Sequence, residues 1–328
     1  MQEARFYEKK QNSMVQCQLC PHNCLIKPGN TGVCGVRKNI DGVLYAMYYA
    51  IVSSVAMDPI EKKPLYHFYP GSDILSIGSY GCNFKCKFCQ NYHISQNYER
   101  GETLSSLKLL EINKKHRSIG LSYTYNEPLI NYEYIYDCSK LLKEHGFYNV
   151  LVTNGYINPE PLNELLPYIY SANIDLKSIN NDFYKRLCSG TVEPVKQTIK
   201  TIFEKGALVE VTNLIIPGEN DKDEEIDGII DFIYSISPDL PLHFSKYFPR
   251  YKFNAPETPD DRLIYIYKRA KKKLHYVYTG NMYHQESSNT YCPDCNELLI
   301  ERFGYNIKSY ISANRCKKCG KEIYLKIK

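Results

Sequence analysis

Three cysteines in the first third of the chain have the spacing C-x3-C-x2-C, and they are Cys82, Cys86 and Cys89. Cysteine thiolates are the usual ligands of iron–sulfur clusters, and a 4Fe–4S cluster normally takes four of them. A loop with three cysteines therefore leaves one iron without a protein ligand, and such an open position is typical of catalytic metal sites. The alternatives are a zinc site completed by His93, or reduced structural thiols.

A second group of four cysteines lies within 18 residues near the start of the chain, and its members are Cys17, Cys20, Cys24 and Cys34. This density predicts a compact metal-binding segment. Zinc and a second iron–sulfur cluster are both open here. The nearby His22 and the shortness of the segment favour zinc.

The third group has the spacing C-x2-C-x20-C-x2-C and consists of Cys292, Cys295, Cys316 and Cys319. This spacing is typical of a zinc ribbon, in which four thiolates close the coordination sphere of a structural Zn²⁺ ion. A single iron of the rubredoxin type is the alternative.

Charge and composition limit the possible partners. The 328 residues carry a net charge of +5 and are 43% apolar, which indicates a packed core and no strong attraction to nucleic acid or an anionic membrane. The first residues have no apolar signal region, and no run approaches 18 apolar residues. We therefore expect a cytoplasmic protein, and in that reducing compartment clustered cysteines indicate metal or redox chemistry.

The elements that position these cysteines can be predicted from the alternation of short apolar runs and amphipathic stretches. Amphipathic segments such as 132–145 and 224–235 predict helices between the runs. Repeated strand–helix alternation predicts an α/β fold with a parallel sheet, here a partial (β/α)6 TIM-like barrel. The runs that predict strands are 74–79, 120–125, 148–153, 172–176, 208–216, 242–247 and, more weakly, 275–278.

This organisation predicts three regions: a cysteine-rich metal-binding segment at 1–50, the partial barrel at 51–285 and a zinc ribbon at 286–328. In such sheets the reactive groups gather at the carboxyl ends of the strands. Polar residues follow or lie within successive predicted strands, and they are Glu127, Asn154, Lys177, Asn213 and His243.

Asp175 and Lys177 share one face of a predicted strand, because side chains alternate with a period of two. Opposite charges on a buried strand are unfavourable unless they pair or bind a ligand. A structural ion pair is the alternative to a ligand site for Asp175 and Lys177. For Asn126 and Glu127 the alternative is a helix cap, and for Asn154 it is a turn.

The cysteine triplet resembles that of the radical S-adenosylmethionine (radical SAM) superfamily, in which S-adenosylmethionine chelates the open iron. The resemblance implies reductive cleavage of S-adenosylmethionine to a 5′-deoxyadenosyl radical that abstracts hydrogen from a substrate. It also implies an external electron donor such as flavodoxin or ferredoxin. Phe88 matches an aromatic position that family members place near the adenine.

Further segments resemble relatives of pyruvate formate-lyase activating enzyme. The segment 123–128 looks like the one that meets the methionyl amino group, and 153–155 and 175–177 look like two other activase motifs. Together with the strand positions, the resemblance gives candidate cofactor-binding residues, which are Phe88, Asn126, Glu127, Thr153, Asn154, Asp175, Lys177, Asn213 and His243.

Over nearly its whole length the chain resembles the AmmeMemoRadiSam system radical SAM enzyme family, on the segments 17–24, 58–68 and 300–305. This implies partner proteins of that system and a distant relation to glycyl-radical-enzyme activases. Segment 58–68 could line a substrate entrance or serve as a rigid connector. The alternatives for function are an activase, an RNA-modifying enzyme that uses the ribbon, and a non-enzymatic metal-binding scaffold. The sequence does not identify the substrate.

Overall fold

An open sheet of eight strands, in the order β16-β15-β14-β13-β12-β11-β9-β8, forms the centre of this computed structural model, which describes residues 1–98 and 101–327. β8 (Ser54–Pro59) runs antiparallel to β9 at one edge. The strands that run parallel are β9 (Asp73–Gly78), β11 (Gly120–Tyr123), β12 (Tyr148–Thr153), β13 (Ser171–Asp175), β14 (Leu208–Ile215), β15 (Leu242–Lys246) and β16 (Val277–Gly280).

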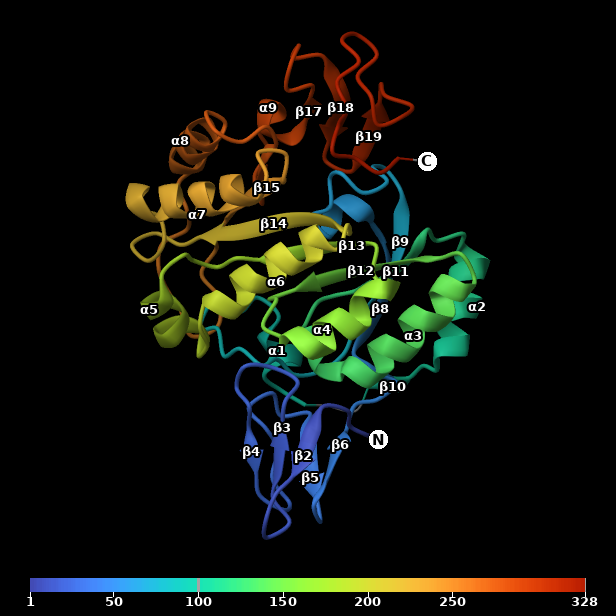
Figure 1. The fold of residues 1–328 in the computed structure, drawn as a ribbon. Helices are drawn as coiled ribbons and strands as arrows, with labels where there is room; N and C mark the ends of the chain where they lie inside the picture. Colours follow the sequence, from blue (N-terminus) through green and yellow to red (C-terminus); the bar gives the residue numbers. More distant parts are fainter. Residues whose placement is uncertain (99–100, 328) are drawn as a thin grey trace.

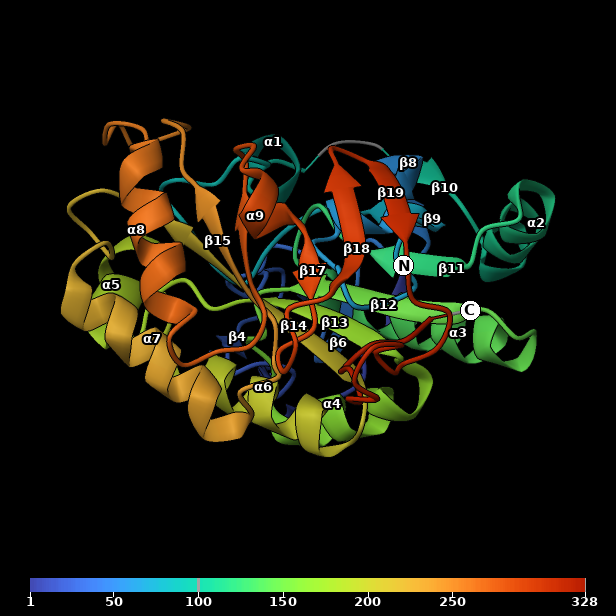
Figure 2. The same cartoon turned by 90° about the horizontal axis from the view of Figure 1, so that it is seen from above.

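Helices cover the outer face of this sheet (Figures 1 and 2). In α7 (Asp223–Ile236) the buried residues include Ile226, Ile229, Ile230 and Ile233, a helical spacing that directs one apolar face at the sheet. The other long helices are α2 (Ser106–His116), α3 (Tyr132–Glu144), α4 (Pro159–Leu165), α6 (Glu193–Glu204) and α8 (Asp260–Ala270). The short ones are η1 (Ile60–Lys62), α1 (Tyr92–Ser95), η2 (Pro128–Asn131), η3 (Leu166–Tyr168), α5 (Asn181–Phe183), the π-helix η4 (Tyr184–Cys188) and α9 (Gln285–Ser288).

The N-terminal residues form a small β-module at the carboxyl ends of the barrel strands, drawn in blue at the bottom of Figure 1. The backbone N–H of Asn158, which lies beyond the end of β12, donates to the carbonyl of Leu19 at 3.0 Å. The strands of the module are β1 (Gln2–Glu3), β2 (Tyr7–Lys9), β3 (Val15–Cys17), β4 (Leu25–Ile26), β5 (Arg37–Ile40) and β6 (Val43–Ala46), and β7 (Ile51–Val52) then pairs with β10 (Glu102–Thr103).

The C-terminal ribbon lies at the opposite end, against the amino ends of the strands (Figure 1). The hydroxyl of Tyr324 accepts a hydrogen bond of 2.9 Å from the N–H of Val209, near the start of β14. The strands of the ribbon are β17 (Thr290–Tyr291), β18 (Leu298–Phe303) and β19 (Asn306–Ser309). In the described part of the chain, no helix has the length and apolar character needed to span a bilayer.

The predicted α/β fold with a parallel sheet is confirmed, and so is a ribbon that can hold a metal. Six predicted strands begin and end within two residues of the observed ones, and the weaker seventh lies two residues later, at β16. β8 was not predicted, because its mixed sequence and partly exposed residues give no apolar run. The boundaries at 50 and 285 stay a prediction.

Candidate active site

The cysteine triplet lies on the loop between β9 and α1, which packs against the last residues of η4. The N–H of Lys85 donates to the carbonyl of Cys188 at 2.8 Å, and the N–H of Lys87 donates to the carbonyl of Leu187 at 3.0 Å. At Gly190, an added Cβ would lie 2.3 Å from the ring of Phe84, so only glycine permits this close approach. The loop is therefore anchored on elements about 100 residues further along the chain.

The thiols of the triplet are in an environment that suits metal ligands. The N–H of Phe84 donates to Cys82 Sγ at 3.3 Å, and Cys89 Sγ lies 3.2 Å from Ser95 Oγ. Burial raises the pKa of both the Cys82 and Cys89 thiols, so ionisation would be unfavourable there without a bound cation. A coordinating metal deprotonates thiols outright. Three thiols on one short loop, with Cys86 buried and the other two half-buried, therefore fit the ligand set of a metal cluster.

Asn126 holds the entrance of this loop. Its Oδ1 accepts a hydrogen bond from the N–H of Ser79 at 2.9 Å, and its Nδ2 donates to the carbonyl of Gly81 at 3.0 Å. On the other side of the loop, Asn91 Nδ2 donates to the carbonyl of Tyr125 at 2.7 Å. The segment that follows β11 is thus joined to both ends of the cysteine loop.

Glu127 is buried, with 3% of its surface exposed, and both of its oxygens accept hydrogen bonds from the chain. Oε1 accepts from the N–H of Leu129 at 3.0 Å and from Thr153 Oγ1 at 2.7 Å, and Oε2 accepts from the N–H of Asn154 at 2.7 Å. Burial raises the pKa of Glu127 to about 7. The carboxyl group caps η2 and fixes the end of β12, so a helix cap is present here, but Glu127 provides it and not Asn126, whose side chain bonds the cysteine loop.

Asn154 connects the end of β12 to the first cysteine. Its Nδ2 donates to Asn83 Oδ1 at 2.9 Å and lies 3.7 Å from Cys82 Sγ. Asn83 is buried in turn and donates to the carbonyl of Tyr156 at 2.7 Å. Hydrogen bonds to coordinating sulfur tune the reduction potential of a cluster. The side-chain amide of Asn154 is therefore placed to tune the potential of a cluster bound through Cys82.

Asp175 and Lys177 form an ion pair of 2.9 Å at the carboxyl end of β13. Burial opposes the charge of Lys177, but the neighbouring Asp175 and Cys86 hold its pKa well above the usual value. The carboxylate side chain is 41% exposed and the lysine side chain 15%. The pair therefore lies next to the cysteine triplet and is in part accessible to a ligand.

Phe88 is buried, and its ring centroid lies 5.9 Å from that of Phe183 and 6.4 Å from that of Phe253. This aromatic group forms an apolar wall directly beside the third cysteine.

Asn213 and His243 differ in where they lie, and their assignment to the cofactor stays a prediction. Asn213 is on the face of β14 opposite to Glu210 and donates to the carbonyl of Leu176 at 2.7 Å, within the packed interior. His243 is the second residue of β15, near the amino ends of the strands, and its Nε2 lies 2.7 Å from Glu210 Oε2. The sequence places a residue on a strand, but it does not show which face or which end meets the cofactor.

Sequence reasoning missed a buried network at this amino end of the sheet. Glu210 Oε1 accepts from the N–H of His67 at 2.7 Å, and His67 Nε2 lies 2.6 Å from the Tyr278 hydroxyl. Arg302 of the ribbon donates to the carbonyl of Tyr66 at 2.7 Å. In segment 58–68 these contacts favour the rigid-connector interpretation. No local signal predicts the network, because its members are distant in sequence.

The ribbon cysteines converge on one point. Their four sulfurs lie within 4.8 Å of one another, with Cys292 and Cys319 at 3.5 Å and Cys295 and Cys316 at 3.6 Å. A tetrahedral ion with Zn–S bonds of about 2.3 Å requires sulfurs that close together. The ribbon can therefore hold a single metal ion.

Comparisons with known proteins agree with this site. Residues 76–233 match the family model described as the radical SAM superfamily. The chain is 45% identical over 333 residues to "Uncharacterized protein MJ0808" of Methanocaldococcus jannaschii, covering 98% of this chain and 99% of that protein. It is 31% identical over 209 residues to "Putative glycyl-radical enzyme activating enzyme MJ1632" of the same organism, covering 62% of this chain and 79% of that one.

Among solved structures, a radical SAM methyltransferase from Sphaerobacter thermophilus aligns with a TM-score of 0.52 at 16% identity, covering 70% of this chain and 71% of that chain. At this identity the likeness shows the fold alone. The chain belongs to the radical SAM superfamily, whose members use a 4Fe–4S cluster and S-adenosylmethionine. Within that superfamily it is related to pyruvate formate-lyase-activating enzyme.

Proposed function

We propose that Cys82, Cys86 and Cys89 bind the 4Fe–4S cluster and that S-adenosylmethionine occupies the fourth iron, beside the Asp175–Lys177 pair. When bound and reduced, this cofactor pair supplies a 5′-deoxyadenosyl radical, which removes a hydrogen atom from the substrate. The observation that carries the proposal is the loop itself. It bears three thiols, one on a buried and two on half-buried residues, at the carboxyl end of β9 and is anchored by Asn126 and Asn154.

The residues around the loop divide into two roles in this proposal. Lys177 and Asp175 offer one positive and one negative group, which suit the carboxylate and the amino group of the methionyl part of S-adenosylmethionine. Phe88 offers an apolar surface to the adenine. Asn126, Glu127 and Thr153 are positioning residues, because their polar atoms are engaged with the chain.

The site also needs an electron source and a structural metal in the ribbon. Radical SAM enzymes generally need an external reductant, and we infer a low-potential flavodoxin or ferredoxin for this chain. We infer zinc for the ribbon, because four converging thiolates match its preferred tetrahedral coordination.

The proposal is tested by electron paramagnetic resonance of anaerobically reconstituted, dithionite-reduced protein. We expect S-adenosylmethionine to change the 4Fe–4S signal of the wild type, because it binds an iron directly. The change should disappear in Cys86→Ala and persist in Cys138→Ala, which alters a buried thiol of α3 outside the three cysteine groups. A wild-type signal that S-adenosylmethionine leaves unchanged would contradict the proposal.

A glycyl-radical-enzyme activase is the second candidate, and it is favoured by the name of the relative MJ1632 and by the relation to pyruvate formate-lyase-activating enzyme. An activase transfers the radical to a partner protein. A glycyl radical signal that appears on an added partner only with S-adenosylmethionine would select this function. The RNA-modifying alternative has less support, since the ribbon lies at the end of the sheet opposite to the cysteine loop.

A further inference from the structure

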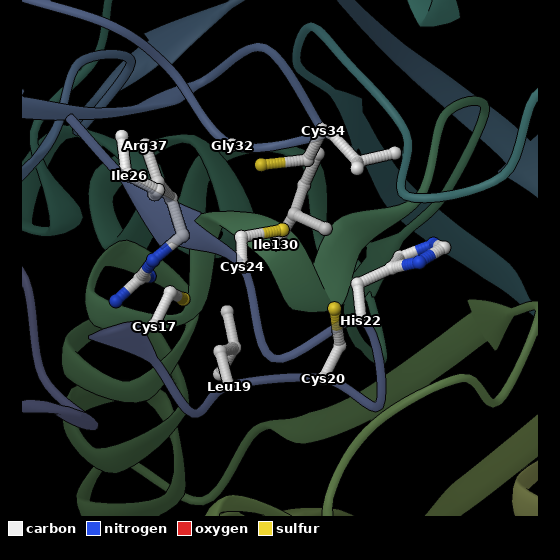
Figure 3. Close-up of a pocket in the computed structure, with 11 residues that line it drawn as sticks. Cys17, Leu19, Cys20, His22, Cys24, Ile26, Gly32, Cys34, Arg37 and Ile130 are labelled. Atoms are coloured by element: carbon white, nitrogen blue, oxygen red, sulfur yellow. The ribbon is translucent and has the colours of Figure 1, made fainter. Parts of the chain in front are cut away.

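The four N-terminal cysteines surround a small cavity between the β-module and η2. Their sulfurs point toward a shared space, and the ring of His22 points away from it (Figure 3). His22 Nε2 donates to the carbonyl of Asn83 at 2.7 Å. This hydrogen bond to the cysteine loop prevents the nitrogen from binding a metal in the cavity. The donor set of the cavity is therefore four sulfurs, which are those of Cys17, Cys20, Cys24 and Cys34.

The separation of these sulfurs favours a cluster over a single ion. Within residues 1–98 and 101–327, only the ribbon cysteines bring three or more ligand atoms within 4.8 Å of one another. Thiolates on one tetrahedral zinc or iron must lie about 3.8 Å apart, given metal–sulfur bonds of about 2.3 Å. Thiolates on a cubane lie further apart, because each binds a different iron. Neither the N-terminal group nor the Cys82–Cys86–Cys89 triplet brings three sulfurs within 4.8 Å of one another in the described part of the chain.

The walls of the cavity also suit a cluster. Buried apolar side chains of Leu19, Ile26 and Ile130 line it and exclude water. Arg37 lines it too, with only 1% of its surface exposed, and its Nη1 pairs with Glu133 at 3.0 Å. Its Nε is buried and has no hydrogen-bond partner among the described residues. An unpartnered, buried N–H is unfavourable unless a ligand accepts from it, and thiolate or sulfide can do so.

We propose that Cys17, Cys20, Cys24 and Cys34 bind a second 4Fe–4S cluster, which passes electrons to the catalytic cluster. The cluster itself is inferred from the cavity alone, whereas its role in electron transfer rests on the proposed function. A low-potential flavodoxin or ferredoxin gives up one electron and reduces the N-terminal cluster. That electron then moves to the catalytic cluster, which leaves the N-terminal one oxidised again.

The position of the cavity supports electron transfer. A Cβ added to Gly81 would lie 2.8 Å from the carbonyl oxygen of Cys34 and 2.6 Å from the side chain of Val36. Gly81 directly precedes Cys82, so the last N-terminal cysteine touches the backbone next to the first catalytic one. Tyr98 donates to the same carbonyl at 3.0 Å. The two cysteine groups are thus in van der Waals contact through their loops.

Iron and sulfide analysis tests for the cluster itself. A chain with Cys82→Ala, Cys86→Ala and Cys89→Ala should, after anaerobic reconstitution, keep about four irons and four sulfides. Adding Cys17→Ser and Cys20→Ser should remove them, whereas adding Cys138→Ser should not. An iron-free triple variant with two zinc ions per chain would overturn the cluster and leave the catalytic proposal intact.

Mössbauer spectroscopy of the reconstituted wild type covers the case in which these variants fail to fold. We expect about eight irons per chain, all in 4Fe–4S clusters, and four would contradict the proposal. Electron transfer is tested by 5′-deoxyadenosine formation in Cys17→Ser/Cys20→Ser. The rate should fall severalfold with reduced flavodoxin as donor but not with the small reductant dithionite. Equal loss with both donors, or no loss with either, would overturn the relay.

Discussion

Glu127 acts on the site through the residues that it positions, because both of its carboxyl oxygens already accept hydrogen bonds from the chain. Its carboxyl group lies at the carboxyl end of β11 and joins η2 to Thr153 and Asn154. Asn154 in turn contacts Cys82. A change at Glu127 should therefore reach the cluster through the position of this asparagine.

The raised pKa of Glu127 predicts a pH-dependent contribution to stability. Its folded-state pKa of about 7 is above the ordinary value of 4.5. The folded chain then binds the proton more tightly, so this contribution is complete below about pH 4.5 and is lost as the pH rises through 7. Glu127→Gln removes the titration and should reduce the decline in unfolding free energy over that interval by about 3 kcal/mol.

Urea denaturation at a series of pH values measures this effect. Glu144→Gln, at an exposed position in the last turn of α3, is the control and should keep the wild-type decline. Parallel curves for wild type and Glu127→Gln would show that this carboxyl group does not titrate in the interval.

At the residue scale, the sequence pointed to motifs that the structure places beside the cysteine loop, but not to the hydrogen bonds that each residue makes there. Asn126, Glu127 and Asn154 were identified because they follow strands and resemble activase motifs. Their hydrogen bonds to backbone groups could not be predicted, since these depend on distances between loops. His243 lies near the start of its strand and bonds Glu210, and its predicted role at the cofactor is not tested by this position alone.

The loop between β9 and α1 depends on the fit of the N-terminal module against it. Gly81 has φ +86°, and an added Cβ there would meet Val36 and Cys34. Gly146, which follows α3, has φ +77° with nothing within 4 Å of an added Cβ. Substitution by a residue with a Cβ would strain the backbone equally at both glycines. Only at Gly81 would the added Cβ also collide with neighbouring atoms.

This comparison predicts different results for two alanine substitutions. Gly146→Ala should lower the free energy of unfolding by about 1 kcal/mol, the typical effect of a side chain in the left-handed region. Gly81→Ala should lower it by about 3 kcal/mol, because overpacking adds to the strain, and should also reduce the iron content after reconstitution. Urea denaturation and iron analysis measure both effects. Equal losses for the two variants would contradict the close contact at Gly81.

At the element scale, apolar runs predicted the parallel strands because these are buried on both faces and so lack polar alternation. The short strands of the N-terminal module, of two to four residues, gave no such signal. Cysteine and glycine spacing predicted a metal site there, but not its strands.

The whole molecule consists of a partial barrel with a cysteine-based module at each end (Figure 1). The N-terminal module contacts the catalytic loop through His22 and Cys34. The ribbon contacts the amino ends of the strands through Arg302 and Tyr324. The proposed electron entry and the ribbon's support of the sheet therefore lie at opposite ends.

This separation predicts that the ribbon metal can be removed without loss of iron. Cys319→Ser should release about one metal ion per chain and lower the thermal midpoint, because the four converging sulfurs are the proposed ligands of that ion. The iron content should equal that of the wild type. Lys318→Ala, which changes a neighbouring exposed side chain, should retain the metal. Loss of iron together with the ribbon metal, measured by mass spectrometry of the elements, would contradict the separation.

Three cysteine groups predicted three metal sites, but the sequence could not predict which end of the barrel each covers. The contacts that decide this, such as His22 with Asn83 and Tyr324 with Val209, join residues 61 and 115 positions apart. Long-range packing of this kind leaves no periodic pattern in the chain.

With the cluster of its cysteine triplet, this chain should cleave S-adenosylmethionine. The direct measurement is 5′-deoxyadenosine formed by anaerobically reconstituted protein with dithionite and S-adenosylmethionine, quantified by mass spectrometry. The wild type and Cys138→Ala should form it, and Cys86→Ala should form no more than a sample without protein. Absence of 5′-deoxyadenosine from wild-type protein with its full complement of iron, or undiminished formation by Cys86→Ala, would contradict the account.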